Sequence, residues 1–317
     1  MATSPVWSIE CKGSVKIPIL GLGTYAAVGD DLKEIIFKAI DVGYRHFDTA
    51  DYYDNLVPLG EAVRKSIADG KVKREDLFIV TKVWPTWYGE GRVEAAVRKN
   101  LKESGLDYFD LVLLHWPFVL GDSDTEKMPL EPGTNRLIFG NRNIVDVYRE
   151  LETVQRKALT RSIGISNFNA EQVERLMKSS ISIYPVTNQV ECHLYLAQFD
   201  LQKICAKHGI ILTAYCPLSR NRAGEKSVLE DEIVKSIATK YSHTTAQIAI
   251  RWLIQRGIIA IPKTTNPERL KINFNVFDFE ISDEDCKILD SLDQGEKGRR
   301  VRMEMNNLRE HPEFPFK

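Results

Sequence analysis

Cysteine is sparse in this sequence and follows no pattern. The five cysteines among the 317 residues are Cys11, Cys192, Cys205, Cys216 and Cys286. Their number is odd, and no two of them form a Cys-x-x-Cys pair. This distribution argues against a disulfide framework and against a zinc site, so we expect no metal in the protein.

Other signals are missing as well. No apolar run approaches the length of a membrane span, and no Asn-x-Ser/Thr acceptor for glycosylation occurs. The first ten residues, MATSPVWSIE, lack the basic start and the apolar stretch of a signal peptide. The formal net charge of −1 leaves no basic surplus for binding nucleic acid. We therefore expect a cytoplasmic monomer without nucleic-acid or membrane partners.

What the sequence does contain is a regular alternation. Short runs that are apolar on both faces, typical of buried parallel strands, alternate with longer stretches of helical spacing. Eight such runs lie at 17–23, 44–48, 77–84, 109–116, 162–168, 186–192, 210–216 and 258–263. Without a break in composition, this pattern predicts an α/β fold, a single (β/α)8 TIM barrel domain over residues 1–317. A doubly wound sheet fits the same pattern.

Two of the helical stretches have boundary signals. The stripe of apolar residues over 32–40 begins near Asp31 and Glu34, which are spaced as a capping box. The stripe over 93–101 is followed by Gly105, at the position of a helix C-cap.

Two segments fall outside the repeat. Residues 117–142 are rich in Gly, Pro, Asp and Asn and predict a long loop at the carboxyl-terminal face of the barrel. Residues 295–317 are charged, and they predict a C-terminal tail rather than a further repeat. Long loops of this kind are often functional.

Polar residues close most of the apolar runs. Functional side chains of such a barrel lie at the carboxyl ends of its strands, where they face one pocket. The polar residues at these ends are Asp48, Lys82, His115, Ser166, Asn167, Gln189, Tyr215 and Lys263. A series of them at one end of one barrel predicts a shared site.

Four residues of this region suit acid catalysis. Asp48, Lys82 and His115 end three successive runs, and Tyr53 follows Asp48 on the next loop. An ammonium stabilises a phenolate, so we expect Lys82 to lower the pKa of Tyr53 from about 10 by roughly 1–3 units. Asp48 would hold Lys82 charged, and His115 could donate a hydrogen bond to a substrate oxygen. This set can protonate an oxyanion as hydride arrives. Taken singly, the same residues could be an ion pair, a packing tyrosine and a buried histidine.

A second group follows the eighth run, in IPKTTNPERLKIN. Asn266 and Pro267 predict the start of a helix, and Lys263 and Arg269 flank that start. A helix N-terminus between cations binds anions, and barrels often hold phosphate at this position. A solvated basic surface is the alternative interpretation.

A glycine motif near the N-terminus needs a different interpretation. GLGTYA (21–26) matches the glycine fingerprint of a Rossmann fold. The helical pattern begins only near Asp31, however, and no second strand precedes the acidic residue Asp41. We interpret Gly21 and Gly23 as part of a tight turn of the barrel.

Taken together, these segments resemble the aldo-keto reductase superfamily, in its aldose, aldehyde and hydroxysteroid reductase-like branch. The resemblance extends from GLGTY at 21 to HPEFPF at 311–316. GYRHFDTADYYDN (43–55) is similar to the first signature of the family, FIVTKVW contains its Lys, and LVLLHWP contains its His. GISNFN, NQVECH and AYCPLS resemble its cofactor-binding segments, and IPKTTNPERLKIN resembles its adenosine-phosphate segment. Several uncommon motifs agree in order, so the match is specific.

The resemblance implies NADPH-dependent reduction of an aldehyde or ketone by hydride transfer, on a barrel that binds an extended NADP(H). Tyr53 would be the general acid, tuned by Lys82 and Asp48, and His115 would orient the carbonyl. Family members that reduce steroid double bonds have Glu at the position of His115, so His predicts carbonyl reduction.

Contacts with NADPH are also implied by the resemblance. They are Gly23, Thr24, Asp48, Ser166, Asn167, Gln189, Tyr215, Leu218, Lys263, Thr264, Arg269 and Asn273. Tyr215 would stack on the nicotinamide. Lys263 and Arg269 would hold the 2′-phosphate, which favours NADPH over NADH.

An apolar substrate pocket is expected beside the catalytic group. Its candidate residues are Tyr25, Tyr52, Trp84, His115 and Trp116, with Trp87 and Phe118 as further aromatic candidates. An apolar pocket with one polar end suits a small aromatic or alicyclic carbonyl compound. Each aromatic residue could equally be barrel packing.

Some positions depart from the family pattern. Ser219 and Arg220 replace the usual Gly-Ser, the loop 221–227 is short, and Ile272 stands where a Glu often clamps the adenine. Tyr25 replaces a common Trp. We therefore expect NADPH to be held loosely, and a slow, rate-limiting release of cofactor in stopped-flow fluorescence would contradict this.

Two other functions are compatible with the sequence. A barrel lysine such as Lys82 is a usual nucleophile of Schiff-base aldolases, and borohydride trapping of substrate on Lys82 would support that activity. A non-enzymatic binding scaffold is the second, because a fold does not fix a function.

Overall fold

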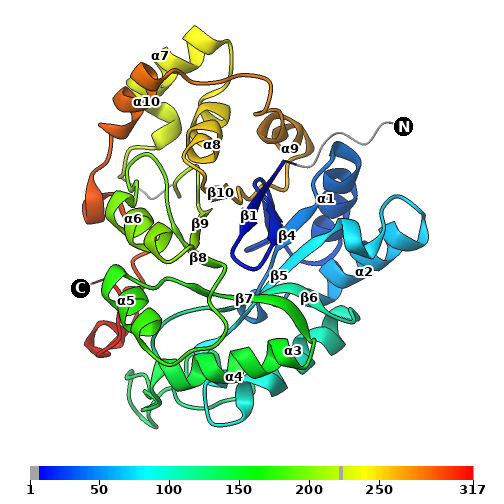
Figure 1. Cartoon of the computed structure of the whole chain (residues 1–317), viewed down its shortest axis with the longest axis vertical. Helices are drawn as coiled ribbons and strands as arrows, with labels where there is room; N and C mark the ends of the chain where they lie inside the picture. The colour runs from blue at the N-terminus through cyan, green and yellow to red at the C-terminus, as the bar shows by residue number, and fades with distance from the viewer. Residues whose placement is uncertain (1–6, 221–223, 317) are drawn as a thin grey trace.

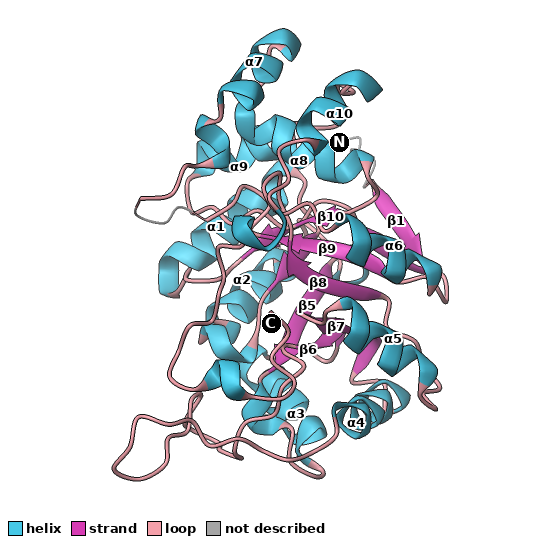
Figure 2. Ribbon diagram, turned by 90° about the vertical axis from the view of Figure 1, so that its left-hand side faces the viewer, coloured by secondary structure: helices cyan, strands magenta, loops and turns pink. Residues whose placement is uncertain are grey.

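Parallel strands form the centre of the computed structural model, which describes residues 7–220 and 224–316 (Figures 1 and 2). These strands are β3 (Leu22–Gly23), β4 (His46–Asp48), β5 (Phe78–Val83), β6 (Phe109–Leu114), β7 (Thr160–Ser166), β8 (Thr187–Glu191), β9 (Ile211–Tyr215) and β10 (Ile259–Ala260). Each pairs in parallel with the next. Parallel pairing of Leu20 with Ala260 and of Gly23 with Lys263 joins the first strand to the last. The predicted (β/α)8 barrel is confirmed.

Helices surround the strands (Figure 1). They are α1 (Gly29–Val42), α2 (Leu56–Ala68), α3 (Arg92–Ser104), α4 (Ile144–Arg156), α5 (Ala170–Lys178), α6 (Phe199–Lys207), α7 (Glu232–Tyr241), α8 (Thr245–Gln255), α9 (Pro267–Phe274) and α10 (Asp283–Asp290). The predicted C-cap is confirmed, since Gly105 ends α3 in the left-handed conformation. The predicted capping box is wrong. Helix α1 begins two residues earlier than expected, with Val28 as N-cap, so Asp31 lies in its first turn, where a carboxylate favours the helix dipole.

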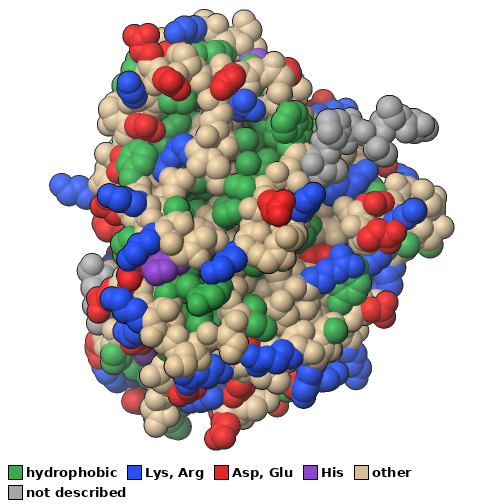
Figure 3. Space-filling model, viewed as in Figure 1, with side chains coloured by type: hydrophobic (Ala, Val, Ile, Leu, Met, Phe, Trp, Pro, Cys, Tyr) green, Lys and Arg blue, Asp and Glu red, His purple; other side chains and the backbone are tan. Residues whose placement is uncertain are grey.

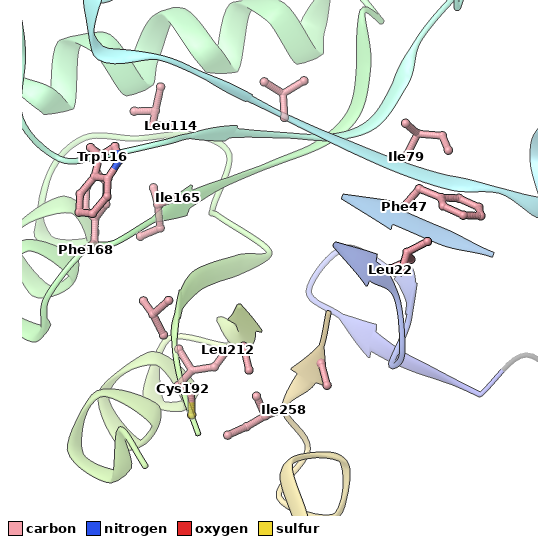
Figure 4. Close-up of a cluster of buried hydrophobic side chains, with 14 of the residues drawn as sticks. Leu22, Phe47, Ile79, Leu114, Trp116, Ile165, Phe168, Cys192, Leu212 and Ile258 are labelled. Atoms are coloured by element: carbon pink, nitrogen blue, oxygen red, sulfur yellow. The ribbon is translucent and has the colours of Figure 1, made fainter. Parts of the chain in front are cut away.

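Two apolar cores follow from the alternation of side chains along the strands. Inside the barrel, Phe78 and Val80 of β5 pack with Leu111 and Leu113 of β6. The intervening residues, such as Ile79, point outward and pack against the helices. Figure 4 shows part of this outer core, in which Leu22, Phe47, Ile79, Leu114 and Ile165 come from neighbouring strands.

The first expected strand, 17–23, is divided in the structure. Strand β2 (Val15–Pro18) pairs antiparallel with β1 (Ser8–Cys11) in a hairpin, and Leu22–Gly23 forms the first strand of the barrel. The turn between β1 and β2 contains Gly13 and Ser14, whose φ values of 81° and 60° let the chain reverse its direction. Cys11 and Ile17 pack into the core inside the barrel, so the hairpin closes the end opposite the strand carboxyl ends.

Gly21 and Gly23 have a different role from the one expected. Gly23 belongs to β3 and Gly21 directly precedes that strand, so neither lies in a turn, and neither has a positive φ. A Cβ atom on Gly21 would lie 2.7 Å from the His46 ring, and one on Gly23 would lie 2.9 Å from the Ile261 carbonyl oxygen. Both glycines permit close approach of neighbouring barrel segments.

The long loop and the tail cover the carboxyl-terminal side of the strands. Between β6 and α4, the loop pairs Leu120 with Phe139 and contains no named strand or helix. The end of the tail packs on α5, where Gln172 donates to the Glu313 carbonyl oxygen at 3.0 Å; the C-terminus lies beside this helix in Figure 1.

The surface shown in Figure 3 mixes cationic and anionic side chains, without a large patch of one sign. None of the helices in the described part of the chain is both long and apolar enough to cross a membrane. In the same residues, no three His, Cys, Asp or Glu side chains are grouped in a way that could hold a metal ion.

Candidate active site

Alternation along the strands places the candidate catalytic residues inside the barrel. On β5, Phe78 and Val80 point inward, so Lys82 points inward one layer closer to the carboxyl end. On β6, Leu111 and Leu113 point inward, and His115 follows directly after the strand. The polar residues therefore form a layer on the carboxyl-terminal side of the apolar core inside the barrel.

Lys82 is the centre of this layer. Its side chain is fully buried, and its Nζ donates to Asp48 Oδ1 at 2.6 Å, to the Thr49 carbonyl oxygen at 2.9 Å and to Tyr53 Oη at 3.2 Å. An ammonium has three N–H groups, and all three have acceptors here. Burial lowers the pKa of Lys82, and the carboxylate of Asp48 opposes that shift.

Asp48 is held from three sides. Its Oδ2 accepts from Gln189 Nε2 at 2.7 Å, and its carbonyl oxygen accepts from Thr24 Oγ1 at 2.8 Å. With Lys82 on Oδ1, both carboxylate oxygens are hydrogen-bonded, as a buried charge requires.

Tyr53 reaches the group from a single turn of 3-10 helix, Asp51–Tyr53, that follows β4. Asp54 ends this turn with φ of 54°, which returns the chain toward α2. Besides its contact with Lys82, the Tyr53 ring lies 5.8 Å from the His115 ring, measured between centroids. Asp48, Tyr53, Lys82 and His115 therefore meet, as the sequence predicts.

The expected decrease in the pKa of Tyr53 is wrong. Burial raises the pKa of Tyr53 well above its ordinary value, and the negative charge of Asp48 adds to this effect. The physical reason is that Asp48 neutralises the ammonium of Lys82, while the phenolate would lose its hydration. Tyr53 therefore keeps its proton at neutral pH.

His115 is buried between aromatic rings. Its backbone is fixed, because its N–H donates to the Val83 carbonyl oxygen at 3.1 Å and its carbonyl oxygen accepts from Asn167 Nδ2 at 2.9 Å. Within the described residues, its Nδ1 has no hydrogen-bond partner. Burial, and then the positive charge of Lys82, lower the pKa of His115 well below its ordinary value, so the ring is neutral.

This shift predicts a pH dependence of stability. Below about pH 6.5 the unfolded chain protonates His115 while the native protein does not, so the free energy of unfolding falls as the pH falls. The loss is at most about 1.4 kcal/mol per pH unit for one histidine. Urea unfolding at pH 7 and pH 5 should show a smaller loss for His115→Asn than for wild type. Equal losses would contradict the lowered pKa.

The residues expected at the nicotinamide lie next to this group and are hydrogen-bonded to each other. Tyr215 Oη donates to Asn167 Oδ1 at 2.7 Å, and Asn167 Nδ2 lies 3.2 Å from Ser166 Oγ. Ser166 Oγ in turn donates to the carbonyl oxygen of Gln189 at 2.8 Å. Asn167 has φ of 64°, so the chain turns sharply after β7. Leu218, further along the same face, is half-buried against the core.

The second predicted group surrounds the start of α9. Asn266 caps this helix by accepting from the N–H groups of Glu268 and Arg269, and Pro267 is its first residue, as predicted. Thr264 and Asn273 are buried, whereas the side chains of Lys263 and Arg269 are exposed. The pairing of Lys263 with Gly23 connects this group to the rest of the site.

The aromatic candidates form a wall beside Tyr53 and His115. Tyr25 lies edge-on to Tyr53 at 5.1 Å, and Tyr52 stacks on Trp84 at 4.0 Å, between ring centroids. Trp84 lies edge-on to His115 at 5.1 Å. Of the other candidates, Trp116 is 6.4 Å from His115, Phe118 is fully buried against Trp116, and Trp87 packs under Arg92.

The long loop reaches this wall. Trp84 Nε1 donates to the Lys127 carbonyl oxygen at 2.6 Å, and Lys127 Nζ donates to the Tyr52 carbonyl oxygen at 2.8 Å. The short loop 221–227 includes residues 221–223, which lie outside the described residues. Ile272 is the residue expected beside the adenine. Its side chain is 39% exposed, so packing does not bury it.

Sequence reasoning missed two supporting residues. Asn55 is fully buried, and its Nδ2 donates to the carbonyl oxygens of Thr24 at 2.9 Å and Ala27 at 3.0 Å, which ties the loops after β3 and β4 together. Glu191 is fully buried at the end of β8 and accepts from the N–H groups of Arg300 at 2.7 Å and Val301 at 2.8 Å. A carboxylate inside an apolar run was the available signal for Glu191.

Comparison with known proteins shows the family of this chain. The aldo/keto reductase family model matches residues 19–294. The chain belongs to the aldo/keto reductase family. Rho crystallin of Aquarana catesbeiana is 39% identical to it over 312 residues, or 95% of this chain and 94% of that protein.

Two further members of the aldo/keto reductase family cover nearly the whole chain. Aldo-keto reductase family 1 member A1-A of Danio rerio is 38% identical over 325 residues, covering 98% of both chains. Aldo-keto reductase family 1 member D1 of Mus musculus is 39% identical over 319 residues, covering 97% of this chain and 96% of that protein.

Proposed function

We propose that this protein reduces an aldehyde or ketone to an alcohol with NADPH, using Tyr53 as the general acid. The observation that carries the proposal is the buried Lys82, which bonds to Asp48 and to Tyr53 Oη at the same time, beside the neutral ring of His115. Membership of the aldo/keto reductase family supports oxidoreductase chemistry on small carbonyl compounds. From the sequence we also propose that the protein is a cytoplasmic monomer and forms a single domain.

The roles of the four residues follow from their protonation states. Tyr53 keeps its proton at neutral pH and donates it to the carbonyl oxygen of the substrate as negative charge develops there. Lys82 donates to Tyr53 Oη and stabilises the phenolate that is left. Asp48 holds Lys82 in place, and the neutral ring of His115 donates one hydrogen bond to the same substrate oxygen.

The residues around this group fit a nicotinamide dinucleotide. When bound, NADPH supplies the hydride. Side-chain amides of Asn167 and Gln189 lie beside the catalytic group, where they can orient a carboxamide. Lys263 and Arg269 lie at a capped helix start, which suits a phosphate.

The two cations should decide the choice between NADPH and NADH. We expect Lys263→Met and Arg269→Gln each to raise the Kd for NADPH about tenfold, because each removes a charged partner of the 2′-phosphate. The Kd for NADH should change little. Quenching of protein fluorescence measures both constants, and Lys271→Met, in an exposed pair with Glu268 on α9, is the matched control. Equal effects on both cofactors would contradict this assignment.

The proposal is tested with a panel of carbonyl compounds and NADPH, followed by nicotinamide absorbance. Carbonyl-dependent oxidation of NADPH by the wild type, lost in Tyr53→Phe, is the expected result. If no aldehyde or ketone in a broad panel is reduced, the proposed function is wrong.

A Schiff-base aldolase is disfavoured by the surroundings of Lys82. A nucleophilic lysine needs a free amine that its substrate can reach. The side chain of Lys82 is instead 0% exposed, and Asp48, Thr49 and Tyr53 occupy its three donors. Borohydride trapping should therefore leave Lys82 unmodified.

A further inference from the structure

One residue of the long loop holds the Tyr53 turn, which consists of Asp51–Tyr53 and of Asp54 at its end. The ammonium of Lys127 donates to the Tyr52 carbonyl oxygen at 2.8 Å, and it also forms an ion pair with the carboxylate of Asp54. Tyr52 directly precedes Tyr53 in the sequence, and Asp54 directly follows it. A single side chain therefore binds both neighbours of the proposed general acid.

The backbone of Lys127 is fixed as well. Its carbonyl oxygen accepts from Trp84 Nε1 at 2.6 Å. The Trp84 ring stacks on the Tyr52 ring at 4.0 Å between centroids, and Lys127 Nζ lies 5.1 Å from the centroid of the same Tyr52 ring. These contacts form a closed cycle between three segments, namely the long loop, the Tyr53 turn and the residue that follows β5. Packing and hydrogen bonds of this kind hold a catalytic group within the narrow geometry that it needs.

The other ion pairs of the long loop lead away from the Tyr53 turn. Asp124 pairs with Arg92 on α3 at 2.5 Å, and Arg136 pairs with Glu310 of the tail at 2.6 Å. Among the hydrogen bonds and ion pairs of residues 7–220 and 224–316, those of Lys127 alone join the long loop to the Tyr53 turn.

The two bonds of the Lys127 ammonium differ in strength. The side chain of Asp54 is 76% exposed and that of Lys127 is 31% exposed, so water screens their attraction and the ion pair contributes little. The bond to the Tyr52 carbonyl oxygen is the stronger anchor, because its donor is charged and because Trp84 packs on the same residue.

We propose that Lys127 is a positioning residue for the general acid Tyr53. By joining the long loop to both neighbours of Tyr53, it holds the phenol oxygen at the place where Lys82 and the substrate oxygen meet. Small displacements of a reacting group cost rate steeply, because proton transfer requires hydrogen-bond distance. This inference rests on the proposed function, because it names a further residue that serves the same site.

The first test is the variant Lys127→Met, which keeps the apolar stem of the side chain and removes its ammonium. We expect the single-turnover rate of carbonyl reduction, followed by NADPH absorbance, to fall about tenfold, while the Kd for NADPH stays within about twofold of the wild-type value. Lys127→Arg keeps the charge and its N–H donors and should restore most of the rate. Lys65→Met, from an exposed pair with Asp69 on α2, is the matched control and should keep the wild-type rate.

The variant Asp54→Asn separates the two bonds of Lys127. Asparagine tolerates the φ of 54° at this position, so the backbone of the turn remains. We expect the single-turnover rate to change by less than about twofold, because only the screened ion pair is lost. A fall as large as that in Lys127→Met would contradict the assignment of the Tyr52 carbonyl oxygen as the anchor.

A second measurement on Lys127→Met does not depend on turnover. In protein labelled with 3-fluorotyrosine, the fluorine NMR signals of Tyr53 and Tyr148 are identified by their absence from Tyr53→Phe and Tyr148→Phe. In Lys127→Met the signal of Tyr53 should shift or broaden. The signal of Tyr148, which bonds to the Ile183 carbonyl oxygen on the outer side of the barrel, should stay unchanged.

The outcomes separate this inference from the proposed function. If Lys127→Met raises KM and leaves the single-turnover rate unchanged, Lys127 holds only the wall of the pocket and does not position Tyr53. An arginine variant as slow as Lys127→Met would also overturn the inference. If the wild type reduces no carbonyl compound, the proposed function fails, and the fluorine signal of Tyr53 alone decides whether Lys127 positions it; an unchanged signal means that it does not.

Discussion

Replacing Tyr53 by Phe is expected to lower kcat for carbonyl reduction by about 10²- to 10⁴-fold. The substitution removes a single oxygen atom, the Oη that lies 3.2 Å from Lys82 Nζ on a ring beside His115, and with it the phenol proton. The ring remains, so its contact with Tyr25 and the shape of the pocket remain too. The Kd for NADPH, measured by fluorescence quenching, should therefore stay within about twofold of the wild-type value.

The matched control is Tyr148→Phe. Tyr148 is also fully buried, and its Oη donates to the Ile183 carbonyl oxygen at 3.1 Å, on the outer side of the barrel. It should keep wild-type kcat although it loses a hydrogen bond. If Tyr53→Phe retained most of the activity, the proton would have to come from another group, and the assignment of Tyr53 would be wrong.

The buried pair of Lys82 and Asp48 should dominate stability in this region. We expect Lys82→Met and Asp48→Asn each to lower the free energy of unfolding by about 3–5 kcal/mol, because each leaves one buried charge without its partner. The double variant should lose clearly less than the sum of the two single losses. Urea unfolding of the four proteins measures this coupling.

The comparison for this cycle is an exposed pair. Arg149 and Asp146 are 2.6 Å apart on α4, with both side chains about half exposed. Arg149→Met should change the unfolding midpoint hardly at all. If Lys82→Met were equally mild, the ammonium would not be buried as a charge, and its role beside Tyr53 would need another explanation.

That the four candidate catalytic residues lie together was predictable because their placement depends on local periodicity. Residues two apart on a strand share a face, so the inward positions of Val80 and Leu113 determine where Lys82 and His115 point. The cap at Asn266 was equally local. Tyr53 needed only a short loop after Asp48 to reach Lys82 on the neighbouring strand.

What sequence reasoning missed depends on distant parts of the chain. The N-terminal hairpin exists because Cys11 and Ile17 fill the interior of the barrel, and their partners lie on later strands. The hydrogen bond from the Arg300 N–H to Glu191 joins two segments that are far apart in the sequence, and no periodic pattern of side chains predicts their contact. The direction of the pKa shift of Tyr53 was missed for a related reason, since it depends on how completely the folded barrel removes water from the phenol.

Closure of the barrel has a consequence for the order in which this protein can mature. The amide of Gly23 donates to the Pro262 carbonyl oxygen at 3.1 Å, and the next residue, Thr24, holds the backbone of Asp48 through two contacts, at 3.1 and 2.8 Å. The support of Asp48 therefore depends on a strand from the far end of the chain. On a ribosome, the nascent chain would carry all four side chains of the proposed catalytic group long before that strand emerges. Activity should accordingly appear only after Pro262 has left the ribosome, and fragments that end before Pro262 should be inactive even though they contain every residue of the proposed catalytic group.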